Sequence, residues 1–236
     1  MTEPQQMCDW STRAVNLPEH DSNPIHTDEG ARAKGFPAAL VAGVTVYAYL
    51  SHLPATAWGP GWVSGGGAHV RFRSPVLDGD TVDCVALDGD IVEGRVGGEV
   101  RARSEMFRTA PDLPTRPGEA LEPYEFVLEQ PWLDYGERGG DDHPLYTEQE
   151  IAHPVAWLTI ANRFFGDQLV NGPWIHVRSI VAHHGVAPLG STISAEAVVV
   201  DRFDSRAGRR AIADVRIHAD GALVATLEHE AIIELS

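Results

Sequence analysis

The stretch GFPAALVAGVTVYAYLSHL at residues 35–53 decides the fold. It opens a longer segment, Gly35 through Val70, that contains no Asp, Glu, Lys or Arg. A membrane-spanning helix needs about 20 consecutive, mostly apolar residues, and this run is interrupted too often by Gly, Pro and polar residues to supply them. We therefore expect a helix that ends near Leu53 and is buried on nearly every side by other parts of the protein. We do not expect this segment to enter a membrane.

Strands are predicted on both sides of this helix. They are rich in Val, Phe and alternating Arg, and the Asp-Gly-Asp turns at 78–80 and 88–90 separate some of them. A polar loop at Pro18–Glu29 lies between the first strand and the helix. One buried helix with mostly antiparallel strands around it is an α+β arrangement. The predicted strands are Trp10–Leu17, Ala68–Ser74, Thr81–Leu87 and Glu99–Phe107.

The same order of elements recurs after a segment with four prolines, Thr109–Pro123, which is typical of a linker. A strand at Tyr124–Glu129 and a polar loop to His143 precede a second apolar helix, predicted at Thr147–Phe165. Thr147 and Glu150 match a capping box, which places the start of that helix. The strands predicted to follow are Trp174–Val181, Ser191–Phe203, Arg210–His218 and Ala222–Leu235.

The residues recur as well as the elements. DSNPIHTD at Asp21–Asp28 aligns with DDHPLYTE at Asp141–Glu148, at the same place in both orders. We therefore interpret the chain as an internal duplication. It would have one domain at 1–108, a linker at 109–123 and a second domain at 124–236. Each half would contain a long central helix wrapped by an antiparallel sheet, and the two sheets could join edge to edge.

Composition limits the function classes. Against 18 Lys and Arg stand 34 Asp and Glu, a net charge of −16, so the chain lacks the basic surface of a nucleic-acid-binding protein. The two cysteines, Cys8 and Cys84, form no C-x-x-C motif, and Met1–Trp10 has no signal-peptide pattern. We expect a cytoplasmic protein. No metal motif occurs, because the adjacent His183 and His184 would point to opposite faces of a strand.

The polar loop before the first helix contains the candidate catalytic residues. Asp21, Asn23, His26 and Asp28 lie within eight residues, beside the most apolar part of the chain. In a loop, a carboxylate and an imidazole can converge on one water molecule, and histidine exchanges protons near neutral pH. Turn and capping hydrogen bonds from Asp21 and Asn23, with His26 on the surface, explain the same spacing. Spacing alone leaves both interpretations open.

Two motifs in this half resemble those of the MaoC-like (R)-specific enoyl-CoA hydratases and dehydratases. Asp21-Ser-Asn-Pro-Ile-His-Thr-Asp28, followed by Gly35-Phe36 and Gly43, is similar to their D-x-N-P-[IL]-H-x-D signature. The run from Val70 to Val82 resembles their F-x-x-P-V-x-x-G-D strand and turn. Two departures are Glu19-His20 where the family has Ser-Gly, and Val41-Ala42 where it has Ala-His.

The resemblance implies a double hotdog fold and a lyase of fatty acid metabolism. Asp21 and His26 would be the catalytic dyad that activates one water, the Gly43 amide would donate to the thioester oxygen, and Asn23 would orient the site. The substrate would be an acyl-CoA or acyl-carrier-protein thioester. Hydration of its α,β-unsaturated bond, or dehydration of the 3-hydroxyacyl form, needs no cofactor. A monomer of fused hotdogs or a homodimer is expected.

The second half has Tyr146 where the first has His26, and a phenol is a poor base at neutral pH. One active site per chain follows. Asn162, Trp174 and His176 could reach its pocket, although core packing and strand-surface polarity explain them as well. Two other functions stay open: a hotdog thioesterase, in which the carboxylate would activate water against the thioester carbonyl, and a catalytically silent acyl-binding or partner subunit.

Overall fold

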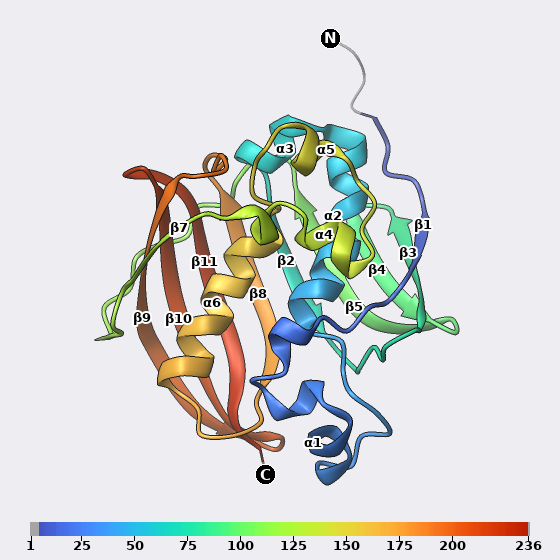
Figure 1. Cartoon of the computed structure of the whole chain (residues 1–236), viewed down its shortest axis with the longest axis vertical. Coiled ribbons are helices and arrows are strands. Elements are labelled where there is room, and N and C mark those ends of the chain that lie inside the picture. The colour runs from blue at the N-terminus through green and yellow to red at the C-terminus, as the bar shows by residue number, and fades with distance from the viewer. Residues whose placement is uncertain (1–4, 236) are drawn as a thin grey trace.

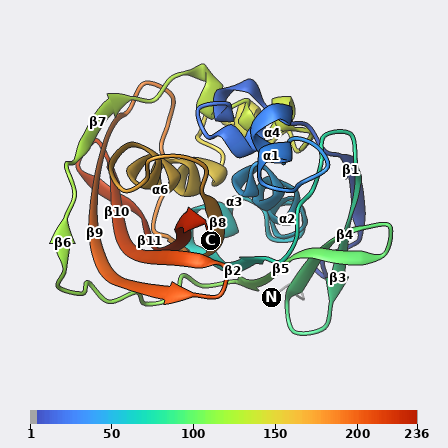
Figure 2. The ribbon, with the colours of Figure 1, turned by 90° about the horizontal axis from the view of Figure 1, so that it is seen from below.

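An eleven-stranded antiparallel sheet curves around two long helices in the computed structural model, which describes residues 5–235 (Figures 1 and 2). The strands follow the order β1-β3-β4-β5-β2-β8-β11-β10-β9-β6, and β7 also pairs with β9. Residues 1–4 of the predicted domain 1–108, and residue 236 of the predicted domain 124–236, lie outside the described residues.

The strands vary widely in length, and the three longest, β9, β10 and β11, belong to the second half. Their bounds are β1 Trp10–Arg13, β2 Gly67–Phe72, β3 Thr81–Leu87, β4 Ile91–Val96, β5 Glu99–Phe107, β6 Glu119–Ala120, β7 Tyr124–Val127, β8 Ile175–His183, β9 Thr192–Ser205, β10 Gly208–Ala219 and β11 Ala222–Leu235.

The helices comprise two long ones, α2 and α6, and several short ones, of which α1, α4 and α5 precede the long helices and α3 follows α2. Their bounds are α1 Asp28–Ala33, α2 Gly43–Trp58, α3 Pro60–Gly65, α4 Tyr135–Gly139, α5 Leu145–Glu148 and α6 Val155–Gln168, with 3₁₀ turns η1 Pro18–His20, η2 Pro24–His26 and η3 Gln130–Trp132.

The two halves of the sheet meet where β2 pairs with β8, in a register that runs from Gly67 opposite Ala182 to Arg71 opposite Arg178. This antiparallel pair leaves neither half with an open edge at the centre of the molecule. Figure 2 shows α2 and α6 side by side within the curve of the sheet, one against each half. The fold is α+β, and two helices each wrapped by half of one sheet form the double hotdog predicted from the sequence.

The first long helix differs in position from the prediction. It begins at Gly43, because the preceding residues pair with the segment after β2: Val41 donates its N–H to the carbonyl of Val76, and Leu40 bridges Leu77. It also continues past Leu53 to Trp58. Nearly the whole of α2 is buried, as its lack of charge predicts. No helix in the described part of the chain is long and apolar enough to cross a membrane.

Two local predictions are wrong. The second long helix begins at Val155 and not at the Thr147 capping box, because Thr147 donates its hydroxyl to the carbonyl of Pro144 and Glu150 has a left-handed φ of 52°. The structure also has a strand at Ile91–Val96, which was not predicted because Gly94 interrupts the apolar pattern. A Cβ on Gly94 would lie 3.2 Å from Leu50 of α2, so the glycine lets the helix pack closely on the sheet.

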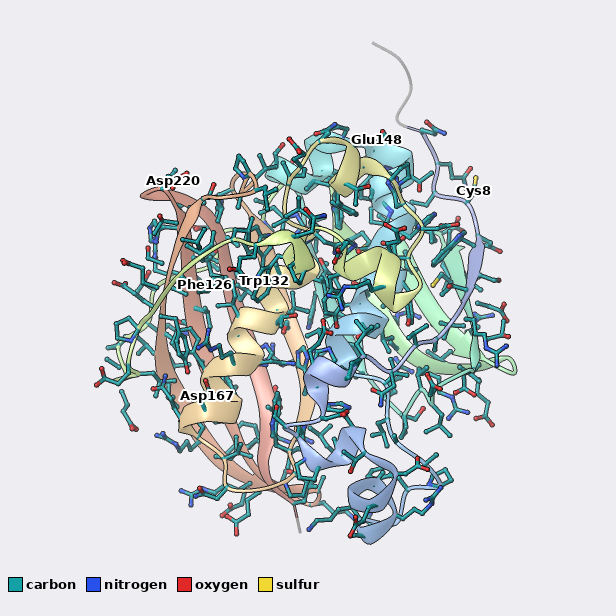
Figure 3. All side chains as sticks on the ribbon, in the orientation of Figure 1. Cys8, Phe126, Trp132, Glu148, Asp167 and Asp220 are labelled. Atoms are coloured by element: carbon teal, nitrogen blue, oxygen red, sulfur yellow. The ribbon has the colours of Figure 1, made fainter. Side chains whose placement is uncertain are left out.

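The chain from β7 to η3 closes over α6. Phe126 stacks on Trp132 with ring centroids 5.5 Å apart near one end of the helix, and Asp167 lies at the other end (Figure 3). Tyr124 donates its hydroxyl to Asp167 over 2.9 Å and packs against Phe164. These contacts bury α6 on the side that the sheet leaves open.

Candidate active site

A cavity of about 340 Å³ lies between the two halves, beside the first turn of α2. This volume is in the lower part of the range for small-molecule sites. Side chains from the segment before α2, from α2 itself, from β2 and its following loop, and from β8, β10, β11 and α6 line it. Its apolar wall includes Phe36, Leu40, Val46, Trp174, Ile175 and Ile232. The second half therefore contributes directly to the cavity.

Short capped turns build the loop that carries the predicted catalytic residues. Asn23 caps η2 and Thr27 caps α1, accepting from the N–H groups of Ile25 and Gly30. The α1 helix folds back so tightly that a Cβ on Gly30 would lie 2.1 Å from the carbonyl oxygen of Pro24. The loop and α1 sit at the foot of α2, at the end opposite α3 (Figure 1).

His26 lines the cavity and has a defined tautomer. Its Nδ1 lies 2.7 Å from the carbonyl oxygen of Leu40. A carbonyl only accepts, so Nδ1 carries the proton and Nε2 keeps its lone pair. Burial lowers the pKa of His26, while the Leu40 carbonyl and the Asp21 charge act in the opposite direction. His26 is therefore neutral at pH 7 and can accept a proton.

Asp21 occupies a different position from the one expected of a close partner. Its side chain is exposed and is not part of the cavity wall, although its charge raises the pKa of His26. The ring nearest to His26 on this side is His20, 5.7 Å away between centroids, and His20 is hydrogen-bonded to the Tyr135 hydroxyl over 2.6 Å. The structure thus places His26, but not Asp21, in the cavity wall. That the two side chains bind one water molecule between them stays a prediction.

Asn23 holds the loop against the second half. Its Nδ2 donates to the carbonyl of Trp174 over 3.0 Å, and its Oδ1 accepts from the N–H of Trp174 and of Ile25, each over 3.4 Å. The side chain is buried, lines the cavity, and is engaged with backbone groups. Asn23 therefore fixes the position of the turn that carries His26.

Gly43 is the first residue of α2 and lies at the cavity. No side chain caps this end of the helix, so the positive end of the helix dipole faces the cavity. A Cβ at Gly43 would lie 3.3 Å from the Phe72 ring and 3.4 Å from Nδ1 of His176. An anionic oxygen at this place would be stabilised by the helix terminus.

Asn162, Trp174 and His176 of the second half all line the cavity. Trp174 also belongs to the hydrophobic core, as the packing alternative predicts, whereas His176 is buried and not on a strand surface. Nδ1 of His176 and Oδ1 of Asn162 are buried without a hydrogen-bond partner. Burial lowers the pKa of His176 to about 3. The sequence marked these residues only as candidates for the pocket wall, because their placement depends on the β2–β8 pairing between distant segments.

Three arginines reach the cavity, at 73, 101 and 210. Arg210 is paired with Glu230 over 2.7 Å, and Arg101 with Glu99 over 3.1 Å. Arg73 is exposed, and among the residues that the structure describes its guanidinium has no acidic partner. It is therefore a free positive charge at the rim of the cavity in an acidic protein.

The corresponding loop of the second half forms a closed ionic cluster. Asp141, which aligns with Asp21, is 1 % exposed and is bonded to Nδ1 of His52 over 2.6 Å and to Nε2 of His153 over 3.0 Å. Burial alone would raise the pKa of Asp141, but the two histidines outweigh it and lower the pKa to about 2. Tyr146, which aligns with His26, is buried, and burial raises its pKa well above 10. Tyr146 therefore cannot act as a base at pH 7 in the way proposed for its counterpart His26.

Within the described residues, a single group places ligand-type atoms within 4.8 Å of one another: His52, Asp141 and Asp142. None of these three lines the cavity, and Nδ1 of His52 is already bonded to Asp141. His183 and His184 have separate partners, the carbonyl of Trp62 and the hydroxyl of Thr226.

Comparison with protein families matches residues 16–108 to the model described as MaoC like domain. A putative MaoC domain protein dehydratase from Chloroflexus aurantiacus J-10-fl has a similar structure, with a TM-score of 0.64, 12 % identity, and coverage of 100 % of this chain and 99 % of that one. No curated protein matches the sequence.

Two further solved structures have the same fold. A conserved hypothetical protein from Mycobacterium tuberculosis, described as a double hotdog, has a TM-score of 0.60 at 11 % identity and covers 98 % of this chain and 96 % of its own. A putative oleoyl thioesterase from Lactobacillus plantarum has a TM-score of 0.54 at 9 % identity, with coverage of 98 % and 97 %. At these identities the likeness shows the fold.

Proposed function

Because the chain carries a MaoC-like domain at residues 16–108 within a double hotdog, we propose that it hydrates the double bond of an α,β-unsaturated acyl-CoA thioester. In the reverse direction it dehydrates the 3-hydroxyacyl thioester. The observation that carries the proposal is the position of His26. Its Nδ1–H is held by the Leu40 carbonyl, so its Nε2 lone pair is available in the wall of a largely apolar cavity beside the start of α2.

In this mechanism His26 takes a proton from a water molecule. The oxygen of that water bonds to Cβ of the substrate, and the electron pair of the double bond moves toward the thioester carbonyl. The proton held by His26 then passes to Cα, so the elements of one water are added and none are left over. The negative charge on the carbonyl oxygen would be stabilised by the Gly43 amide at the positive end of α2.

Asp21 has a supporting role in the proposal. Its charge favours the protonated form of His26, which forms during the reaction, and the pair could hold the water between them. Its exposed position means that the carboxylate must turn inward when substrate binds if it is to touch that water. Asn23 would keep the turn in place through its bonds to Trp174.

Crotonyl-CoA tests the proposal directly. Loss of the enoyl absorbance without release of free thiol supports hydration, whereas release of thiol supports the thioesterase alternative. Saturable binding of the thioester without either reaction would instead indicate a silent acyl-binding subunit.

The two members of the dyad are tested separately. We expect His26→Ala to abolish turnover. Asp21→Asn should reduce kcat by 10-fold or more if the carboxylate contacts the water, because positioned acid–base groups contribute about 10²–10⁴ in rate. Full activity of Asp21→Asn would remove that carboxylate from the mechanism and leave His26 as the sole base.

A further inference from the structure

A buried histidine of the second half faces the same cavity as His26. His176 lies on β8 and is 7 % exposed, and it lines the cavity next to the first turn of α2. Its Nδ1 has no hydrogen-bond partner, although leaving a buried polar atom without a partner normally destabilises a protein. The mechanism proposed above does not use this atom.

The other ring nitrogen of His176 belongs to a buried chain of hydrogen bonds. Nε2 of His176 lies 2.8 Å from the Ser179 hydroxyl, which lies 2.8 Å from Nδ1 of His229. Ser179 and His229 are fully buried. At the far end, Nε2 of His229 also lacks a partner, and the ring packs against Phe165 with centroids 4.9 Å apart. This series of hydrogen bonds therefore ends at both sides in a ring nitrogen without a partner, and only the nitrogen of His176 is at the cavity.

The chain can be polarised in two directions, because the hydroxyl accepts one bond and donates the other. In one direction the remaining N–H is on His229, in the closed core, and His176 presents a lone pair. In the other, His229 keeps a lone pair and His176 presents its Nδ1–H to the cavity. Buried N–H groups without an acceptor are rarer than buried acceptors without a donor. The second direction places the N–H where a ligand can accept it, so it is the more stable one.

Nδ1 of His176 lies close to Gly43, the first residue of α2. Nδ1 is 3.4 Å from the position a Gly43 Cβ would occupy, and the Phe72 ring packs against both residues. Two donors from different halves of the chain therefore border one small volume of the cavity. That volume suits a single oxygen that gains negative charge during a reaction.

We propose that His176 is a catalytic residue whose Nδ1–H donates a hydrogen bond to the carbonyl oxygen of the bound acyl thioester, together with the amide of Gly43. Ser179 and His229 are positioning residues that keep the proton on Nδ1. This inference rests on the proposed function and adds to it that the oxyanion site is built from both halves. A neutral imidazole is a suitable donor for this purpose, since it can stabilise an enolate without giving up its proton.

Turnover of crotonyl-CoA by three variants tests the role of the donor. His176→Leu should lower kcat by roughly 100-fold with little change in KM, because loss of one oxyanion donor costs about 10²–10³ in kcat. His176→Asn keeps an N–H near the place of Nδ1 and should recover part of that loss. Ser179→Ala should lower kcat less than His176→Leu. The control is His184→Asn. His184 follows the end of β8 and bonds Thr226 outside the cavity, so this change should leave kcat unchanged.

A second measurement does not depend on turnover. Butyryl-CoA, a saturated thioester that cannot take up water, is titrated into the full chain labelled with ¹⁵N-histidine, and the ring signals of His176 are assigned from their loss in His176→Asn. We expect a downfield shift of the Nδ1 proton on saturation. Because it uses the chain with His176 in place, this experiment tests the contact of His176 with the thioester even if His176→Leu does not fold.

The two proposals fail in different ways. A shift with butyryl-CoA but no hydration of crotonyl-CoA would refute the proposed function and leave the contact of His176 with the thioester standing. Hydration with unchanged kcat in His176→Leu would overturn the role of His176, as would an Nδ1 signal that is unprotonated or does not move when butyryl-CoA binds.

Discussion

The buried cluster of Asp141, His52 and His153 should contribute strongly to stability while being dispensable for catalysis. A fall in the pKa of Asp141 from 3.8 to about 2 on folding corresponds to about 2 kcal/mol, at about 1.36 kcal/mol per pH unit. We therefore expect Asp141→Asn to lower the free energy of unfolding at pH 7 by about 2 kcal/mol. With an m-value of about 3 kcal/mol/M, the urea midpoint would fall by about 0.7 M.

The sign of the pH dependence follows from the direction of this shift. A carboxylate with a lowered pKa in the folded state stabilises the protein above its unfolded pKa, and the stabilisation is lost as pH falls through the folded pKa. The difference between native protein and Asp141→Asn should therefore be full above about pH 5 and about half as large at pH 3. Burial of His176 also weakens the fold at acid pH, but its pKa shift does not depend on Asp141, so this contribution is the same in both proteins and cancels in the difference.

Urea unfolding followed by circular dichroism at pH 7 and pH 3 measures both quantities. Asp142→Asn is the matched control, because this neighbouring carboxylate is 79 % exposed and should leave the midpoint nearly unchanged. The folded Asp141→Asn variant should retain its turnover of crotonyl-CoA, since Asp141 does not line the cavity. Equal midpoints at pH 7, or a difference that does not shrink on acidification, would refute this account of the cluster.

Three further predictions concern the cavity. Arg73→Glu should raise KM for crotonyl-CoA several-fold but not for crotonyl-pantetheine, which lacks the nucleotide phosphates. Arg71→Glu, an exposed change two residues earlier on β2, should leave both KM values unchanged. Gly43→Ala should lower kcat at least 10-fold because its Cβ meets side chains at 3.3 and 3.4 Å, whereas Gly61→Ala, with open space around it, should not. As pH is lowered, kcat/KM should fall with an apparent pKa below 6.5, because burial lowers the pKa of His26 and protonation removes the proposed base. A pH–rate profile with this inflection above 6.5 would contradict the role of His26.

The overall architecture could be predicted because its determinants are local. An uncharged run can form a helix only if other structure covers it, and period-two strands with Asp-Gly turns define the sheet around it. Boundaries were harder to predict, since they depend on tertiary contacts. The start of α2 is set by the pairing of Val41 with Val76, and β4 was missed because its Gly94 has a role only against Leu50 of the helix.

The site could be predicted only in part, for the same reason. The motif singled out His26 as a candidate, and the structure places it in the cavity wall. Its hydrogen-bond partner, the carbonyl of Leu40, lies only 14 residues later in the chain. The sequence could not reveal that Asp21 would be exposed, because a loop of this kind leaves the direction of each side chain to its packing. Nor could it place His176, whose position beside Gly43 is created by the pairing of β2 with β8.

The two aligned loops differ in what they contribute. The loop of the second half forms a buried ionic cluster, and the loop of the first half lines the cavity. Asp141 is enclosed by a histidine from each half, a geometry that fixes its charge, and the residue aligned with His26 is the buried Tyr146. In the first loop the carboxylate of Asp21 is exposed and the imidazole of His26 faces the cavity. Because Asn23 ties that loop to the backbone of the second half, the fused chain can hold its base against a wall that the second half provides.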